Sequence, residues 1–108
     1  MQKIACDIVY IKDISLKKHN LEKFLSFFEN EKLKKIKNRQ KKRHYIAGII
    51  AGKEAIFKIF NQIFDFSSIN LIDENSNHLP KIYFNNNHIS LSISHVKDYA
   101  IAVAILDN

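Results

Sequence analysis

The sequence contains few of the residues that interrupt regular structure or cross-link a chain. Its 108 residues include two glycines, one proline and one cysteine. The scarcity of glycine and proline, with a hydrophobic content of 46%, excludes a low-complexity disordered chain and predicts a globular protein. The single cysteine, Cys6, cannot form a disulfide within the chain. Because it lies in an apolar segment, we expect it to be a small buried packing residue.

Long hydrophobic runs and a leader pattern are also missing. No apolar run approaches the roughly 20 residues that a membrane helix needs, and the first residues lack the charged-then-apolar order of a signal peptide. A chain of this length builds one core, so we expect a single domain over residues 1–108. These absences predict a cytoplasmic protein without a membrane segment.

Acidic residues are outnumbered by basic residues, 11 to 17, which gives a formal net charge of +6. Such an excess predicts an acidic partner, which could be a nucleic acid, an acidic protein or a phosphate-rich cofactor. Lysine, isoleucine and asparagine are abundant while arginine is rare, a bias typical of AT-rich coding sequence. Lysine clusters are therefore less informative here than usual, and charge alone does not choose the partner.

Hydrophobic periodicity predicts a strand at the N-terminus and helices in the rest of the first half. Residues 3–11 are expected to form a strand with two largely apolar faces, one of which is interrupted by Asp7. Apolar residues at helical spacing predict a helix over about 16–28 and a charge-rich helical segment over 30–42. The strongest helix is predicted over 43–63. Its apolar residues cover more than one face, which indicates a helix buried in the core.

The second half of the chain predicts strands separated by turns. We expect strands at Ser67–Ile72, Lys81–Phe84, His88–Ser94 and Tyr99–Leu106, with a turn at Asp73–Asn77. Alternate alanines in the last strand would allow a neighbouring subunit to approach closely. The predicted fold class is α+β, a single domain in which an antiparallel sheet packs against a long buried helix and shorter helices.

Three groups of polar residues interrupt the apolar pattern. Asp7 places a carboxylate in an apolar strand, which is costly unless the group is paired, binds a cation or turns to solvent. Glu54 and Lys58 lie one helical turn apart, as an ordinary exposed ion pair or as a half-buried pair that a ligand approaches. His95 ends a strand, as a turn histidine or as a ligand contact. No histidine spacing matches a zinc site.

The order of these groups along the chain resembles that of one protein family. The sequence IACDIV contains Asp7, KEAIFK runs from Lys53 to Lys58, and SISH ends at His95. Together they resemble holo-acyl-carrier-protein synthases, which belong to the 4'-phosphopantetheinyl transferases. The resemblance implies transfer of the phosphopantetheine arm of coenzyme A to a serine of apo acyl carrier protein, with release of 3',5'-ADP. It also implies a homotrimer with sites between adjacent subunits.

The resemblance implies a role for each polar residue. Asp7 and Glu54 would bind magnesium, an ion that favours one or two carboxylates completed by phosphate oxygens and water. Lys58 would reach the pyrophosphate of coenzyme A, and Lys53 and His95 would contact the cofactor. Glu54 or a metal-bound water would take the proton of the serine, while Lys58 would stabilise the leaving phosphate. Glu54 and Lys58 would then be the catalytic residues.

Three positions depart from the family pattern. Ile49 stands where the family has an arginine that holds nucleotide phosphates. We expect Lys41, within the basic run 39–44, to supply replacement charge. The glycine loop that follows the catalytic helix of the family is replaced by residues 58–64, and Asp13 stands where a basic residue is expected.

Lysines on and just before the first predicted helix could dock an acidic carrier protein: Lys12, Lys17, Lys18 and Lys23. Two alternatives stay open from the residues alone. The spaced positive charges over 32–43 are compatible with a small nucleic-acid-binding module, although no recognition motif accompanies them and no nucleic acid is expected. A catalytically inactive relative would keep the same fold as an interaction module.

Overall fold

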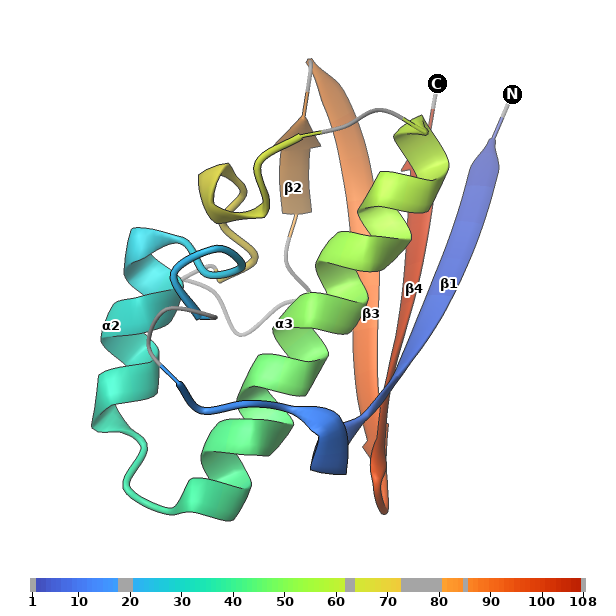
Figure 1. Cartoon of the computed structure of the whole chain (residues 1–108). Coiled ribbons are helices and arrows are strands. Elements are labelled where there is room, and N and C mark those ends of the chain that lie inside the picture. Colours follow the sequence, from blue (N-terminus) through green and yellow to red (C-terminus); the bar gives the residue numbers. More distant parts are fainter. Residues whose placement is uncertain (1, 18–20, 62–63, 73–80, 85, 108) are drawn as a thin grey trace.

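The computed structural model describes residues 2–17, 21–61, 64–72, 81–84 and 86–107, and its centre is an antiparallel sheet (Figure 1). The strands are β1 (Lys3–Tyr10), β2 (Lys81–Phe84), β3 (Asn87–Val96) and β4 (Tyr99–Asp107). Their spatial order is β1-β4-β3-β2. The first strand is therefore an edge strand, and it pairs with the last one so that Asp7 lies opposite Ala102.

Most of the strand predictions are confirmed. The strands expected at 3–11, 81–84, 88–94 and 99–106 all form, with ends that shift by one or two residues. The strand expected at Ser67–Ile72 is wrong. A short 3-10 helix, η2 (Phe66–Ser68), and an irregular segment occupy these residues instead. The turn expected at Asp73–Asn77 lies outside the described residues.

The long buried helix is α3 (Arg39–Phe60), which lies across one face of the sheet (Figure 1). It begins four residues before the predicted start because Asn38 forms the N-cap, and its side chain accepts a hydrogen bond from the Lys41 amide at 3.0 Å. It ends at Asn61, whose φ of 50° is left-handed. Asparagine here adopts the conformation that glycine usually supplies after a helix.

The helix predicted over 16–28 is corrected by the structure. Residues 14–17 are irregular, residues 18–20 lie outside the described residues, and Leu21 is helical. Residues 22–24 form a turn, and α2 (Phe27–Lys35) begins only after Ser26. The side chain of Ser26 accepts from the Glu29 amide while Glu29 accepts from the Ser26 amide, which is a capping box. The second predicted segment, 30–42, is consequently divided between α2 and α3. The 3-10 helix η1 (Ile11–Asp13) follows β1.

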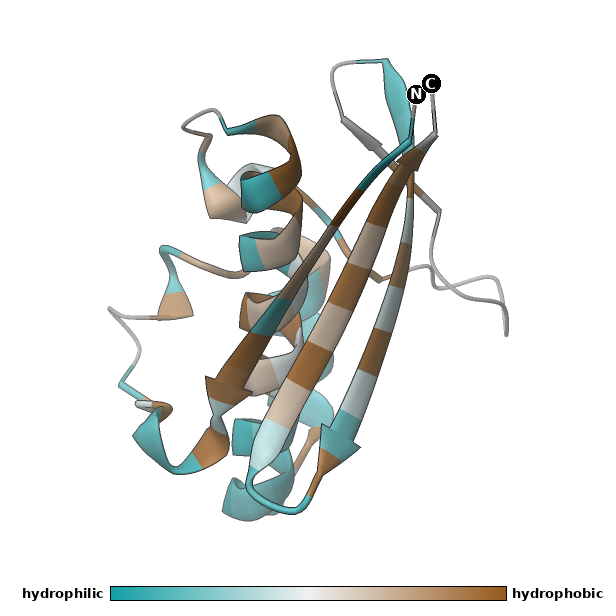
Figure 2. Ribbon diagram, turned by 90° about the vertical axis from the view of Figure 1, so that its right-hand side faces the viewer, coloured by the Kyte–Doolittle hydropathy of each residue, from teal (hydrophilic) through white to brown (hydrophobic). Residues whose placement is uncertain are grey.

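The two faces of the sheet have different surroundings (Figure 2). On one face α3 covers Ala100, Ala102 and Ala104, which are fully buried, so these alanines admit the helix of their own chain rather than a neighbour. No described helix lies over the other face. That face carries large exposed apolar side chains, defined here as the open apolar face: Ile4, Ile8, Tyr10, Val96, Tyr99 and Val103.

Cys6 lies on the open apolar face and is exposed, so the prediction that it is a buried packing residue is wrong. The reason is the alternation of β1, whose odd-numbered residues face α3 and whose even-numbered residues face outward. In the described parts of the chain, no helix combines the length and the apolar character needed to cross a membrane.

Candidate functional site

Two carboxylates and a lysine converge where β1 passes the C-terminal half of α3. Asp7 points toward the helix because it is an odd-numbered residue of β1, and Glu54 and Lys58 lie one turn apart on α3. The Lys58 ammonium donates to Asp7 Oδ1 at 2.8 Å and to the carbonyl oxygen of Cys6 at 2.9 Å. We call Asp7, Glu54 and Lys58 the carboxylate site.

The charges of the carboxylate site are only partly compensated. Burial raises the pKa of Glu54, the negative charge of Asp7 raises it further, and the positive charge of Lys58 opposes both effects. The hydrogen bond to Asp7 raises the pKa of Lys58. One ammonium group, that of Lys58, therefore lies near two carboxylates. The resulting excess of negative charge favours binding of a further cation at this site.

The donor set fits a hard cation such as magnesium. Among the described residues, no group of three or more histidine, cysteine or acidic side chains gathers where it could hold a metal alone. Two carboxylates with an open side are nevertheless what magnesium uses when phosphate oxygens and water complete its shell. The Lys58 side chain is half exposed and Asp7 retains 19% exposure, so the site is open to a ligand.

The predicted cofactor contacts Lys41 and His95 lie near the other end of α3. Lys41 is exposed in the first turn, and the His95 ring nitrogen Nε2 lies 2.8 Å from the carbonyl oxygen of His44. The two histidine rings are 5.8 Å apart between centroids. We call Lys41, His44 and His95 the basic end. Along the helix, at 1.5 Å per residue, Lys41 lies about 20 Å from Glu54 and His44 about 15 Å.

A glycine allows His95 to lie against the helix. A Cβ atom built at Gly48 would approach the His95 Nε2 to 3.1 Å and the Ile93 side chain to 3.2 Å. A side chain at this position would therefore crowd the ring. The next residue, Ile49, is buried in the core at 5% exposure. Ile49, which occupies the position of the family arginine, consequently adds no charge to the surface of this chain.

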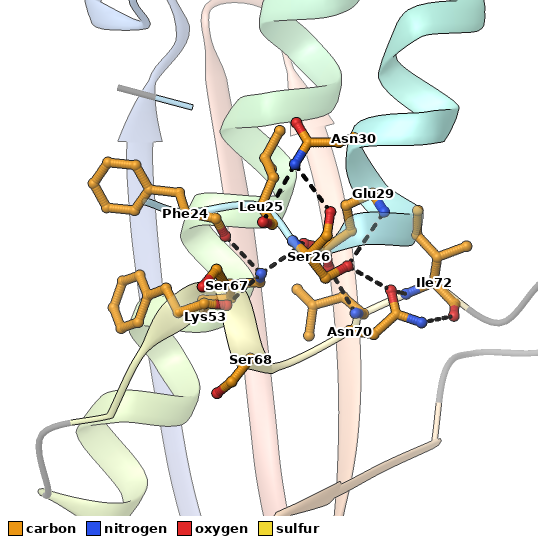
Figure 3. A network of polar contacts seen from close by, with 12 residues as sticks. Phe24, Leu25, Ser26, Glu29, Asn30, Lys53, Ser67, Ser68, Asn70 and Ile72 are labelled. Atoms are coloured by element: carbon orange, nitrogen blue, oxygen red, sulfur yellow. Dashed lines mark hydrogen bonds and ion pairs between the residues drawn. The ribbon is translucent and has the colours of Figure 1, made fainter. Parts of the chain in front are cut away.

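The prediction that Lys53 binds the cofactor is contradicted by its position. Its side chain is fully buried, and its ammonium donates to the carbonyl oxygens of Phe24 and Phe66 and to Glu29 Oε1, each at 2.6 Å (Figure 3). An ammonium has three N–H donors, so none is left for a ligand. Burial lowers the pKa of Lys53, and the hydrogen bond to Glu29 opposes this shift.

The sequence pattern alone does not identify Glu29 as the partner of Lys53. The signal that was available is the serine three residues earlier, because Ser26 and Glu29 form a capping-box pattern. That pattern predicts the helix start but not the ion pair, since Lys53 is 24 residues away in the sequence.

A pocket of about 540 Å³ lies between residues 14–17 and the first turns of α3. Its apolar lining is bordered by four basic side chains, those of Lys17, Arg39, Lys42 and Arg43. The Arg43 Nε donates to the carbonyl oxygen of Ile14 at 3.4 Å, which ties the two walls together. None of the three carboxylate-site residues lines this pocket.

A family model and two relatives assign this chain to the same family. The model of the 4'-phosphopantetheinyl transferase superfamily matches residues 3–104. The holo-[acyl-carrier-protein] synthase of Mycoplasma capricolum is 38% identical over 103 residues, which cover 94% of this chain and 91% of that protein. The synthase of Petrotoga mobilis is 30% identical over 113 residues, which cover 95% of this chain and 93% of that protein.

Solved structures of the same kind of enzyme share the fold. The Helicobacter pylori holo-[acyl-carrier-protein] synthase in complex with coenzyme A has a TM-score of 0.78 and 32% identity, covering 97% of this chain and 100% of that chain. The Bacillus anthracis enzyme in complex with CoA (3',5'-ADP) has a TM-score of 0.82 and 26% identity, covering 95% of this chain and 93% of that chain. The α+β prediction is thereby confirmed.

Proposed function

The chain belongs to the 4'-phosphopantetheinyl transferase superfamily, and we propose that it performs its reaction at the carboxylate site with magnesium held by Asp7 and Glu54. The activity is that of a holo-acyl-carrier-protein synthase. It transfers the 4'-phosphopantetheine arm of coenzyme A to apo acyl carrier protein. The observation that carries the assignment of the site is the convergence of two carboxylates and a lysine from β1 and α3.

The reaction joins a serine oxygen to phosphorus. The serine hydroxyl of the carrier attacks the phosphorus next to the pantetheine arm, and the bond from this phosphorus to the bridging oxygen breaks, so that 3',5'-ADP leaves. Glu54 would accept the serine proton, because a carboxylate can act as a general base. Lys58 is suited to stabilise the charge on the leaving oxygen. Magnesium, when bound, would neutralise charge on the pyrophosphate.

Intact-protein mass spectrometry tests this function. Apo acyl carrier protein is incubated with coenzyme A, magnesium and the protein, and a parallel sample contains a chelator in place of magnesium. We expect the carrier to gain the mass of one phosphopantetheine group only in the first sample. Modification at the same rate in the chelated sample would contradict the magnesium requirement, and no modification in either sample would contradict the transferase activity.

The carrier protein is acidic, and the pocket beside the first turns of α3 is a suitable docking surface for it. Lys17 belongs to the lysines that the sequence predicts for docking, and the structure adds Arg39, Lys42 and Arg43 around the same apolar lining. Positive charge around such a surface would increase the association rate with an acidic partner, and added salt would reduce it.

We further propose a homotrimer, whose support is the open apolar face together with the separation of the two clusters on α3. Exposed apolar side chains gathered on one sheet face are typical of an interface. Within one chain, Lys41 lies about 20 Å and His44 about 15 Å along α3 from Glu54. A neighbouring subunit that presents its own His95 to this carboxylate site would bring both groups to one molecule of coenzyme A.

Light scattering tests the assembly with a matched pair of variants. Ile8→Lys places a charge on the open apolar face and should dissociate the trimer and reduce transfer. Phe27→Lys alters another exposed apolar residue, on α2, and should leave the trimer intact. Mixing Glu54→Ala with His95→Ala protein should restore part of the activity if the two residues serve one site from different chains. A fully active monomer would refute the trimer.

The free, exposed Cys6 suits a reducing compartment, because thiols of cytoplasmic proteins are kept reduced. A cytoplasmic location is therefore part of this proposal. Retention of the free thiol in protein isolated from its native cells, measured by alkylation and mass spectrometry, would agree with it. Quantitative oxidation of Cys6 in that material would contradict it.

A further inference from the structure

Lys53 and Glu29 form a fully buried ion pair that has no part in the chemistry proposed above. Both side chains have no exposed surface, and Lys53 Nζ lies 2.6 Å from Glu29 Oε1. Burial of two charges is costly, and an apolar pair of similar volume often stabilises a core as well or better. The presence of such a pair therefore raises the question of what it does beyond stabilising the fold.

The pair fixes three segments that are distant in the sequence (Figure 3). Through its three N–H donors, Lys53 joins α3 to the carbonyl oxygens of Phe24 and Phe66. Glu29 accepts from the Ser26 amide with Oε1 and from the Leu71 amide with Oε2, each at 2.7 Å. The chain before α2 and the chain after α3 are thus both tied to one point on the helix.

The neighbouring residue, Gly52, shows that this attachment is close as well as directional. A Cβ atom at Gly52 would approach the Leu71 side chain to 2.8 Å and the Leu91 side chain to 3.1 Å, which is too close without movement. The lack of a side chain at Gly52 therefore leaves room for Leu71, whose backbone amide donates to Glu29. Hydrogen bonding and steric fit both define how α3 sits between this segment and β3.

Glu54 follows these two fixed residues directly. Successive residues of an α-helix are rotated by about 100° around its axis, so constraints at positions 52 and 53 determine where position 54 points. Glu54 lies close enough to Asp7 for the negative charge of Asp7 to raise the pKa of Glu54. A small rotation or slide of α3 would change the distance between these carboxylates on different elements.

We propose that Lys53 and Glu29 are positioning residues, which hold α3 in the one rotation that sets Asp7 and Glu54 at the spacing a divalent cation requires. This inference rests on the proposed function of the carboxylate site. Apolar side chains of the same size would fill the same space but would not impose the same direction, because dispersion contacts are less directional than hydrogen bonds to fixed acceptors.

The test replaces the ion pair without emptying the core. Lys53→Met/Glu29→Gln removes both charges at similar volume, and glutamine preserves the capping box. Manganese is the probe, and its binding to the protein with coenzyme A present is followed by electron paramagnetic resonance. Ile56→Val, at a buried position of the same helix, is the control for a general loss of packing. Circular dichroism establishes that each variant is folded.

We expect the folded double variant to bind manganese about tenfold more weakly than the parent, as when residues that orient metal ligands are replaced. Turnover should fall more than the KM for coenzyme A rises. The Ile56→Val variant should bind manganese like the parent. A folded double variant with the manganese affinity of the parent would overturn the positioning role.

Two further measurements keep each outcome interpretable. If the double variant does not fold, Glu29→Gln alone decides. Its amide oxygen can replace Oε1, but its NH2 group cannot accept from the Leu71 amide, so the tie to that segment is lost. Weaker manganese binding then supports the proposal and parent-like binding overturns it. Asp7→Ala is titrated beside the parent throughout. If these two proteins bind manganese equally, the metal site itself is refuted and the positioning role with it, whereas a difference between them separates failure of the ion pair from failure of the site.

Discussion

Two lysine–carboxylate pairs five residues apart on α3 have opposite surroundings. Lys53 and Glu29 are fully buried at 2.6 Å, while Lys58 and Asp7 lie at 2.8 Å with side chains that are 50% and 19% exposed. The first pair uses every donor of its lysine within the protein. The second stands beside Glu54, with more negative than positive charge. The buried pair can only organise the fold, whereas the open pair can exchange partners with a ligand.

The comparison shows why residue type and sequence position are insufficient to assign function in a helix. Both lysines belong to the same KEAIFK block, and both were predicted to contact the cofactor. The two side chains leave the helix in different directions. Lys53 reaches residues 24–29 and 66, whereas Lys58 reaches β1, and this difference separates their roles. Substitutions at the two positions should therefore affect different properties.

The largest effect on stability is expected for Lys53→Ala. It leaves the Glu29 carboxylate and two carbonyl oxygens buried without their donor, and loss of one partner of a buried ion pair costs about 3–5 kcal/mol. The free energy of unfolding should fall by that amount in urea titrations monitored by circular dichroism. Ile56→Val, expected to cost about 0.5–1.5 kcal/mol, is the packing control. An equal loss in both variants would show that the pair contributes no more than ordinary packing.

The opposite result is expected for Lys58→Ala. The unfolding transition should change little because this lysine is exposed, but turnover should fall about a hundredfold, as when one preorganised donor to developing charge is removed. The KM for coenzyme A should change less than kcat. Lys34→Ala, which breaks the exposed pair with Glu31, is the matched control and should leave turnover unchanged. A loss confined to KM would make Lys58 a ground-state phosphate contact.

The smallest effect concerns pH. The folded-state pKa of Glu54 is raised, so protonation favours the folded state, and this contribution is lost as pH rises from about 4.5 through the raised pKa. In the presence of a chelator, Glu54→Gln should therefore melt at the same temperature as the parent or a few degrees higher at neutral pH. A parent that melts higher than Glu54→Gln at neutral pH would contradict the unfavourable charge at this site.

The elements that depend on apolar pattern could be predicted from the sequence. The three strands at 3–11, 88–94 and 99–106 and the buried helix follow from side chains that alternate or recur every third to fourth residue. Residues 67–72 also show alternation but form no strand. Their backbone groups bond to side chains instead, since the Leu71 amide donates to Glu29 and the Ile72 carbonyl accepts from the Asn70 side chain.

The carboxylate site could be anticipated only in part. The order of Asp7, Glu54 and Lys58 along the chain indicates the family, and the structure brings the three together. The role of Lys53 could not be read from the sequence, because its partner lies 24 residues away and becomes a neighbour only through tertiary packing. The distance from Lys41 to the carboxylate site could not be predicted either, because α3 begins at Arg39, four residues before the predicted start.

If Asp7 and Glu54 form the transfer site, loss of either carboxylate must stop modification of the carrier protein, and the intact mass of the carrier shows whether it does. Apo acyl carrier protein, coenzyme A and magnesium are incubated with the parent, with Asp7→Ala or with Glu54→Ala, after circular dichroism has shown all three to be folded. We expect the carrier to gain one phosphopantetheine group with the parent and to keep its apo mass with either variant. Conversion by either variant at the rate of the parent would contradict the assignment of that carboxylate.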